Sequence, residues 1–167
     1  MSSLVIHPLP PLMDEKCQVL LLGTMPSPKS REAGFYYAHP QNRFWRILST
    51  LLDEPFPETI PERISLCHRH HIALWDVLHS CQIKGADDQS IREPKVNDLR
   101  PLLQQAPIQA IFTTGTKAFH LYKKHCLPMT HRPAVCLPSS SAANCRYHTL
   151  DTLVQAYRVI LPYIEPI

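Results

Sequence analysis

The stretch CQVLLLGTMPS, residues 17–27, decides the fold because it joins a short apolar run to a loop that begins at Gly23. An apolar run of this length without polar alternation is typical of a strand buried on both faces of a parallel sheet. Three further runs of this kind lie at residues 72–75, 108–114 and 133–137. Helix-length segments separate the runs, so the sequence predicts an α/β protein, a three-layer α/β/α sandwich with a central, mostly parallel four-stranded sheet.

The connecting segments carry helix signals. In NRFWRILSTLL, which starts at Asn42, apolar side chains recur at helical spacing, and Asn97 is placed to cap a later helix. The polar segment from His79 to Lys95 is predicted to be irregular, with a turn at residues 85–88. The predicted helices span residues 42–52, 61–71, 97–106, 115–126 and 149–164.

Length and composition restrict the class of protein. The chain has 167 residues, of which 44% are hydrophobic and 19% charged, and this predicts one domain over residues 1–167 with a core at about 17–164. No run approaches the roughly 18 apolar residues of a membrane span, and no basic segment precedes an apolar one at the N-terminus. We therefore expect an intracellular, cytoplasmic monomer with no membrane partner. The formal charge of +3 permits a nucleic-acid partner without requiring one.

Cofactor and metal motifs are absent from the sequence. The chain has 17 prolines but only four glycines, and no two glycines are close enough for a GxGxxG or phosphate-binding loop. The six cysteines include no CxxC pair, so reduced thiols are expected. The cluster CHRHH at residues 67–71 has metal-ligating side chains, but it is typical of a solvated helix end. We expect no cofactor and no metal.

The predicted strand ends indicate where a ligand would bind. In an open α/β sheet, ligands bind at the carboxyl ends of the strands. Here these ends lead into residues 23–27, Asp76, residues 113–115 and residues 137–139. The first end opens a loop over residues 23–41, and loops of that length inside a small domain are usually functional.

Three segments resemble the uracil-DNA glycosylase superfamily. They are GTMPS at 23–27, GFYYAHPQNRFW at 34–45 and LPSSSAAN at 137–144. The second is similar to the mismatch-specific uracil/thymine branch, and the set as a whole is most similar to the hypoxanthine-DNA (deoxyinosine) glycosylases. The resemblance implies a monofunctional, cofactor-free enzyme of base excision repair. Such an enzyme flips a deaminated base, hypoxanthine and secondarily uracil, out of DNA and hydrolyses its glycosidic bond, which also implies a nucleoid-associated protein.

Two departures from the family pattern keep other readings open. Met25 stands where the mismatch branch has an Asn, and Leu137 stands where relatives have His or Asn, so the usual polar groups of both motifs are missing. These departures favour one alternative, a non-catalytic binder of DNA damage. A second alternative, a uracil or G:U mismatch glycosylase, would differ in the size of its pocket. An unrelated hydrolase that uses a loop serine is disfavoured because no G-x-S-x-G elbow surrounds residues 139–141.

The resemblance also implies roles for single residues. Asn42 is the catalytic candidate, and Tyr37 is the aromatic on which an extruded base would stack. Its place at a predicted strand end, and not the resemblance, makes Asp76 a second catalytic candidate, with helix capping as the simpler reading. The expected base-binding residues are Gly23, Thr24, Met25, Tyr36, Tyr37 and His39. The expected DNA-binding residues are Ser27, Ser139, Ser140, Ser141, Ala142, Asn144 and Arg146.

Overall fold

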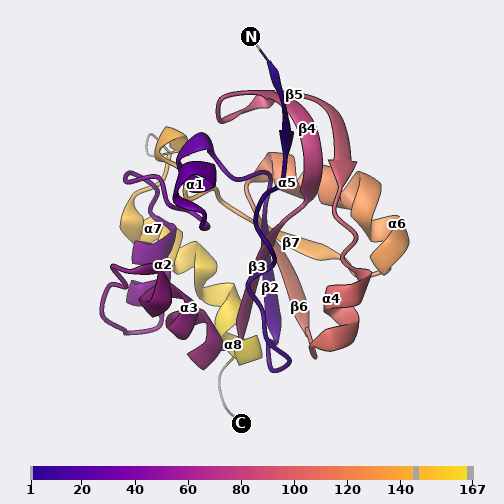
Figure 1. Cartoon of the computed structure of the whole chain (residues 1–167). Coiled ribbons are helices and arrows are strands. Elements are labelled where there is room, and N and C mark those ends of the chain that lie inside the picture. Colours follow the sequence, from indigo (N-terminus) through magenta and orange to yellow (C-terminus); the bar gives the residue numbers. More distant parts are fainter. Residues whose placement is uncertain (1, 145–146, 165–167) are drawn as a thin grey trace.

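The computed structural model describes residues 2–144 and 147–164, and it contains the predicted sheet (Figure 1). All its neighbouring strands are parallel, in the order β3-β2-β6-β7. The four predicted strands are confirmed to within two residues at each end. The strands are β2 (Val19–Gly23), β3 (Ile72–Asp76), β6 (Ala110–Thr114) and β7 (Ala134–Leu137).

Helices cover both faces of this sheet, which confirms the three-layer α/β/α architecture (Figure 1). The helices on one face are α2 (Phe44–Leu51), α3 (Ile60–Arg69), α7 (Leu150–Tyr157) and α8 (Leu161–Ile164), with the 3-10 turn η3 (Arg158–Ile160) between the last two. Those on the other face are α4 (Arg100–Gln105), α5 (Thr116–Leu121), the π-helix η1 (Tyr122–Cys126) and α6 (Leu127–Thr130).

Alternate residues of the central strand β2 supply the two cores. Val19 and Leu21 pack with α2, α3 and α7, whereas Leu20 and Leu22 pack with α4, α5 and η1. All four side chains are fully buried, as expected for the middle of a sheet that is covered on both faces. The apolar run in the sequence is therefore continuous because both sides of the strand face protein.

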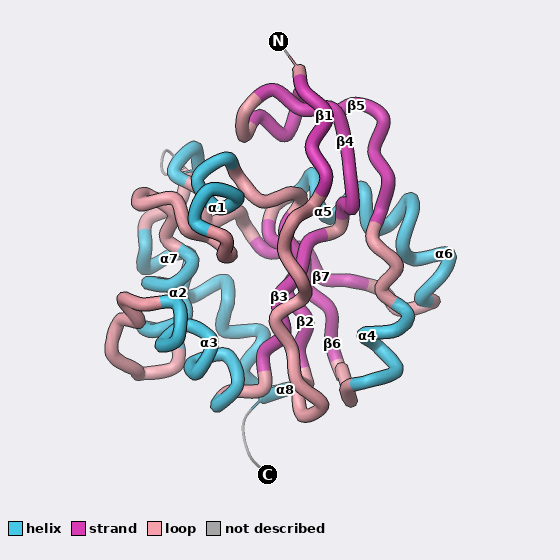
Figure 2. The backbone as a smooth tube through the Cα atoms, in the orientation of Figure 1, coloured by secondary structure: helices cyan, strands magenta, loops and turns pink. Residues whose placement is uncertain are grey.

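A second, antiparallel sheet corrects the prediction for residues 79–95. This segment is an antiparallel hairpin rather than irregular chain, and the N-terminal strand pairs with it in the order β1-β4-β5 (Figure 2). Its polar composition misled the prediction because one side of the hairpin faces solvent, and β5 buries only Ile91. The strands are β1 (Ser3–Ile6), β4 (Leu78–Lys84) and β5 (Asp87–Val96).

The predicted capping role of Asn97 is wrong. The residue that caps α4 is Leu99, without a side-chain hydrogen bond. The buried Asn97 amide instead donates to the carbonyl oxygens of Asp76, at 2.9 Å, and Leu78, at 3.1 Å. An Asn amide satisfies two backbone acceptors at once, so this residue holds the junction where β3 ends and the hairpin begins.

Shorter differences arise within the predicted loops and helices. The long loop contains a short helix, α1 (Pro28–Ala33), and the serine-rich loop contains a 3-10 turn, η2 (Ala142–Asn144). The cysteines in the described residues are free thiols, of which only Cys136 is exposed. Within the described ranges, no helix is both long and apolar enough to cross a membrane.

Candidate active site

A pocket of about 140 Å³ opens at the carboxyl ends of β2, β3 and β6. Three loops and the tip of the β4-β5 hairpin form its wall, so segments far apart in the sequence meet there. Its lining residues are Gly23, Thr24, Met25, Pro26, Ser27, Ser30, Tyr36, Tyr37, Asn42, Asp76, Ile83, Gly85, Ala86, Asp88, Thr114, Ser139, Ser140 and Ser141.

The Asn42 amide has a fixed orientation. Its Oδ1 accepts from the backbone N–H of Phe44 and from the Ser140 hydroxyl, each at 2.9 Å. A backbone N–H can only donate, so the amide atom that faces Phe44 must be the oxygen. The Nδ2 group has no hydrogen-bond partner among the described residues. Asn42 therefore presents a donor to the pocket that it lines.

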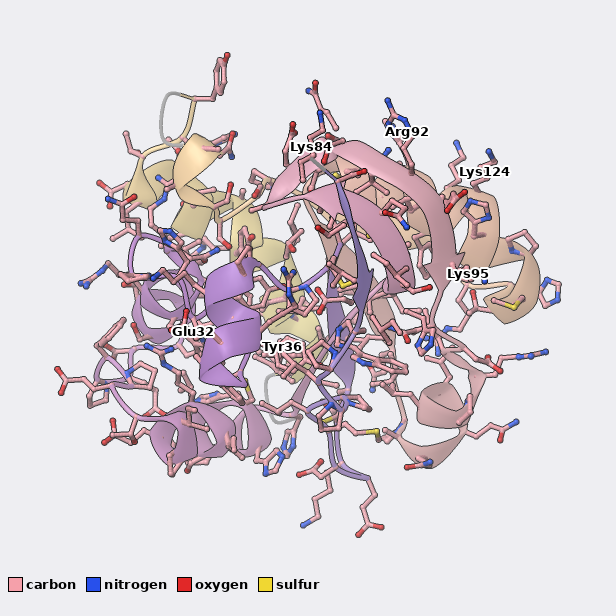
Figure 3. The ribbon with its side chains drawn as sticks, turned by 45° about the horizontal axis from the view of Figure 1, so that its top comes forward. Glu32, Tyr36, Lys84, Arg92, Lys95 and Lys124 are labelled. Carbon is pink, nitrogen blue, oxygen red and sulfur yellow. The ribbon has the colours of Figure 1, made fainter. Side chains whose placement is uncertain are left out.

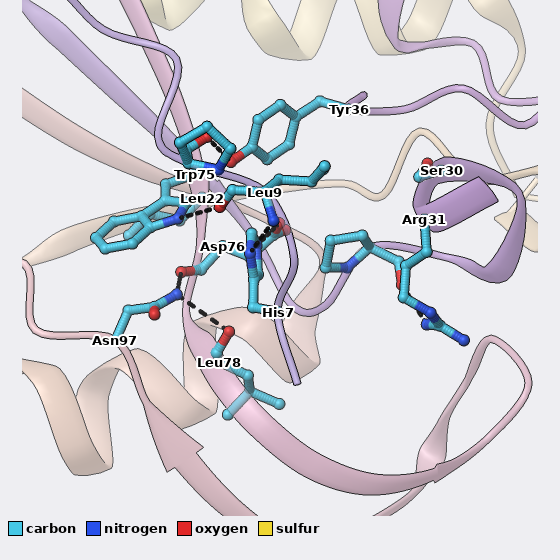
Figure 4. A network of polar contacts seen from close by, with 12 residues as sticks. His7, Leu9, Leu22, Ser30, Arg31, Tyr36, Trp75, Asp76, Leu78 and Asn97 are labelled. Atoms are coloured by element: carbon cyan, nitrogen blue, oxygen red, sulfur yellow. Dashed lines mark hydrogen bonds and ion pairs between the residues drawn. The ribbon is translucent and has the colours of Figure 1, made fainter. Parts of the chain in front are cut away.

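Asp76 lies at the end of β3, where the backbone continues into the hairpin rather than into a helix, so the helix-cap reading is wrong. Its Oδ2 lies 2.7 Å from His7 Nε2, and both side chains are nearly inaccessible to solvent (Figure 4). His7 Nδ1 accepts from the Leu9 N–H at 3.2 Å. Nδ1 therefore carries no proton, and the neutral imidazole donates its Nε2–H to the Asp76 carboxylate.

Gly23 allows Asp76 and Tyr37 to approach the same point of the backbone. A Cβ atom built at Gly23 would overlap Asp76 Oδ1 and lie 3.2 Å from the Tyr37 hydroxyl oxygen. Because Oδ2 is held by His7, Oδ1 is the Asp76 oxygen on the Gly23 side of the pocket. The absence of a side chain at residue 23 thus gives the carboxylate its place.

We expect Gly23→Ala to close the pocket. The added methyl group must displace the Asp76 carboxylate, and overpacking of this kind costs about 1–3 kcal/mol. Urea unfolding measures the loss of stability, and an activity assay of the purified variants measures the effect on the pocket. Gly34→Ala is the matched control, because Gly34 has a φ of +72° but no atom within 4 Å of its added Cβ. This control should lose stability through backbone strain yet keep activity, and equal activity of both variants would contradict the prediction.

Tyr37 is held rigidly at the pocket. Its φ is +52°, an unfavourable value for a non-glycine residue, and its ring stacks on Phe44 at a centroid distance of 3.8 Å and an angle of 13°. Its hydroxyl lies 3.3 Å from Thr114 Oγ1. Burial raises the pKa of the Tyr37 hydroxyl well above 10, and the Asp76 carboxylate raises it further, so the phenol remains neutral. Strain kept by packing is typical of functional sites.

Tyr36 is more deeply anchored than Tyr37. Its hydroxyl donates to the Pro10 carbonyl at 2.8 Å, and only 4% of the residue is exposed. Burial, followed by the charge of Asp76, raises the pKa of this phenol far above its ordinary value. Tyr36 borders the pocket, but most of its surface packs in the core.

The serine loop is tied to the start of α2. The Arg43 backbone N–H donates to the Ser140 carbonyl at 3.0 Å, and the Arg43 guanidinium donates to the carbonyls of Ser141 and His148. Ser139 Oγ accepts the Ser141 N–H at 3.2 Å, which is a turn-forming contact. On the opposite side of the pocket, the Ser27 hydroxyl caps α1 by accepting the Ser30 N–H.

Among the described residues, the structure does not bring three of the predicted ones into the pocket wall. His39 Nδ1 accepts the Gln41 N–H at 3.1 Å, which shapes its loop. Asn144 donates to the Ser139 carbonyl at 2.9 Å, and Ala142 lies beside it in η2. Arg146 lies outside the described residues.

Several site residues were missed by sequence reasoning. Thr114 lies at a predicted strand end, and this position alone could have identified it as a candidate site residue. His7 and Asp88 carry no such signal, because His7 precedes the sheet and Asp88 lies in the polar segment that was predicted to be irregular. Thr24 Oγ1 donates to Asp88 Oδ2 at 3.3 Å, so the hairpin tip is bonded to the loop after β2.

The cluster at residues 67–71, predicted to be a solvated helix end, is divided between core and surface. Cys67 is completely buried, whereas His70 pairs with Glu54 at 3.2 Å. Within the described ranges, no group of three or more His, Cys, Asp or Glu side chains could hold a metal ion.

The fold and pocket together define an α/β/α protein with a pocket at the carboxyl ends of a parallel sheet, between a Gly-x-x-Pro loop, a Tyr-Ala-His-Pro-x-Asn loop and a serine-rich loop. Ligand sites of open α/β sheets form at this edge. The model of the Uracil DNA glycosylase superfamily matches residues 10–164. The chain belongs to this superfamily, as its three motifs predict.

Known relatives support this membership. The chain is 32% identical to a hypoxanthine DNA glycosylase of Methanosarcina barkeri over 139 residues, which cover 82% of this chain and 87% of the relative. It is 33% identical to a hypoxanthine DNA glycosylase of Methanosarcina acetivorans over 140 residues, with 83% and 87% coverage. A solution NMR structure from M. acetivorans, described as a candidate uracil DNA glycosylase, has a TM-score of 0.79 at 27% identity, covering 95% of this chain and 99% of that one.

Proposed function

We propose that this protein is a monofunctional DNA glycosylase that hydrolyses the glycosidic bond of a deaminated base, hypoxanthine first and uracil second. The single observation that carries the proposal is the pairing, in one pocket, of an amide donor on Asn42 with a carboxylate acceptor on Asp76. The names of the two Methanosarcina relatives support hypoxanthine as the principal substrate.

This pairing distinguishes a deaminated base from its parent. Hypoxanthine presents O6 as an acceptor and N1–H as a donor, and uracil presents O4 and N3–H in the same arrangement. Adenine and cytosine present the opposite pattern. Because Asn42 Oδ1 is already engaged, its Nδ2 donates to the base carbonyl while Asp76 Oδ1 accepts the ring N–H. An ionised carboxylate repels the bare N1 lone pair of adenine.

Asn42 also contributes to bond cleavage. The glycosidic bond breaks through an oxocarbenium-like sugar, and the bonding electrons move onto the departing base. A donor at the base oxygen stabilises this developing negative charge and requires no reorganisation, because Phe44 and Ser140 already orient the amide. Tyr37, stacked on Phe44, forms an aromatic wall for the flipped base.

The DNA backbone is the remaining part of the substrate. Ser27, Ser139, Ser140 and Ser141 line the pocket, and serine hydroxyls and loop N–H groups bind phosphate without sequence preference. Basic side chains project outward from the hairpin and the neighbouring α5–α6 segment (Figure 3). They include Lys84, Arg92, Lys95 and Lys124. The sequence has no Asp or Glu between Asp98 and Asp151, which favours contact with an anionic polymer.

A DNA substrate supports the further proposal of a cytoplasmic, nucleoid-associated protein. We also propose that it acts as a monomer formed by one domain over residues 1–167. Light scattering of the purified protein with and without a lesion duplex checks the monomer, and a dimeric mass would contradict it.

The test of the function is direct. Purified protein is incubated with duplexes that carry one inosine, uracil or xanthine, and abasic sites are detected by alkaline cleavage. We expect the fastest product formation from inosine, slower formation from uracil, and full activity in chelator. Lesion binding without an abasic product would establish the non-catalytic alternative, and uracil as the principal substrate would establish the G:U mismatch alternative.

A further inference from the structure

The loop after β2 lacks the polar side chain that the mismatch branch has at this position. Met25 lines the pocket there, and a thioether cannot accept a proton from water. Leu137 is also unsuitable, because it is 2% exposed and packs in the core. A hydrolytic reaction at this site therefore needs its water to be held by a group from another element.

Asp88 brings a carboxylate to the same place. It lies just after the turn of the β4-β5 hairpin and lines the pocket, and its Oδ2 accepts from the hydroxyl of Thr24, the residue beside Met25. The contact joins residues 64 positions apart in the sequence. The antiparallel sheet thus places the carboxylate of Asp88 beside the position in the loop, Met25, where the polar side chain is missing.

The two carboxylates of the pocket lie at different depths. Asp76 is 4% exposed and lies at the end of β3 in the parallel sheet, whereas Asp88 is an exposed residue at the hairpin tip. A flipped nucleotide enters base first, and its sugar remains at the mouth because it is still joined to the DNA backbone. The base therefore meets Asp76, and the sugar and solvent water meet Asp88.

We propose that Asp88 is the catalytic residue that positions the attacking water and accepts its proton. The inference rests on the proposed function. The water oxygen bonds to C1′ of the sugar as the C1′–N bond breaks, and the electrons of that bond leave with the base. One water proton passes to the Asp88 carboxylate and then to solvent, and the base anion takes a proton from solvent. The reaction requires no further reactant.

The surroundings of Asp88 suit this task. The residue as a whole is exposed, but its carboxyl group accepts a hydrogen bond from Thr24. The partial burial of this group disfavours its charged form and so raises its pKa. The carboxylates of Asp87 and Asp76 raise this pKa further, while the Thr24 hydroxyl and Lys117 on α5 lower it. A base must be ionised to accept a proton, so the excision rate should fall as the pH falls through the raised pKa of Asp88.

The experiment measures single-turnover excision from an inosine duplex across enzyme concentration and pH. Varying the enzyme concentration gives two separate quantities, the maximal excision rate and the enzyme concentration at which the rate is half-maximal. For Asp88→Asn we expect a maximal rate lowered about a hundredfold or more, as for loss of a general base. The half-saturating concentration should stay within about threefold of the wild-type value, and the acidic limb of the pH profile should disappear.

Asp87→Asn is the matched control. Asp87 is the preceding exposed carboxylate, it does not line the pocket, and an Asn oxygen can still accept the Gln89 N–H that Asp87 Oδ1 accepts. It should keep the maximal rate and an acidic limb, shifted to somewhat lower pH because the lost Asp87 charge no longer raises the pKa of Asp88. The inference would be overturned if Asp88→Asn excised the base at the wild-type maximal rate or kept the acidic limb of its pH profile. It would also be overturned if the substitution raised only the half-saturating enzyme concentration. Wild-type inertness on every lesion would refute the proposed function itself, and this inference with it.

Discussion

Asn42→Asp is expected to abolish hypoxanthine excision and leave the fold intact. The new carboxylate keeps an oxygen for the Phe44 N–H and the Ser140 hydroxyl, but it replaces the Nδ2 donor with a second acceptor. Removal of one donor from a site that stabilises developing negative charge typically costs about 10²- to 10³-fold in rate. The added negative charge opposes the departing base further, so we expect a loss at or above this range.

Asn42→Ala separates the two roles of this side chain. It removes the donor and also the oxygen that holds the start of α2, so it should lose activity together with about 1 kcal/mol of stability, as for a lost helix cap. Single-turnover excision and urea unfolding of wild type, Asn42→Asp and Asn42→Ala measure the two effects. If Asn42→Asp retained wild-type excision, the donor role of Asn42 would be wrong.

Asp76→Asn is expected to reverse the hydrogen-bonding pattern at the base. Because the tautomer of His7 is fixed by the Leu9 N–H, its Nε2–H still requires an acceptor, and the oxygen of the new amide would supply it. The amide nitrogen then faces Gly23 and the pocket as a donor. A donor there opposes the N1–H of hypoxanthine and matches the bare N1 of adenine.

We therefore expect Asp76→Asn to lower hypoxanthine excision by about 10²-fold or more, since an unmatched buried polar pair is strongly disfavoured. The discrimination between inosine and adenosine duplexes should narrow, as measured by competitive binding. Thermal unfolding serves as the control, because the retained His7 contact should keep the melting temperature close to that of the wild type. Unchanged discrimination would assign the base-reading acceptor to another group.

The sequence was most informative about the parallel sheet and its helices. The runs at 17–22, 72–75, 108–114 and 133–137 have no polar alternation because helices cover both faces, and that burial is readable from composition alone. The same reasoning failed at the β4-β5 hairpin. A sheet with one solvated side needs few apolar residues, and its identity depends on pairing with β1 and packing on a distant core.

For the candidate site, the sequence predicted many of the residues that line the pocket but not how their side chains are oriented. Local motifs and strand ends predicted Gly23, Tyr37, Asn42, Asp76 and the serines, and the pocket brings these residues together. Their orientation was not readable, because the sequence left the Asn42 amide free to face either way. Ser140, 98 residues away, and the Phe44 N–H decide its direction.

The sequence by itself determined the α/β class, the family and the strand ends at which the pocket forms. Only the tertiary structure decided that His7 holds Asp76, that Asn97 anchors the strand junction instead of capping a helix, and that Asp88 reaches Thr24. The physical reason is the range of the interactions. Strand burial and helix spacing leave an apolar pattern in the local sequence, whereas a hydrogen bond between distant residues depends on where the folded chain places its donor and acceptor.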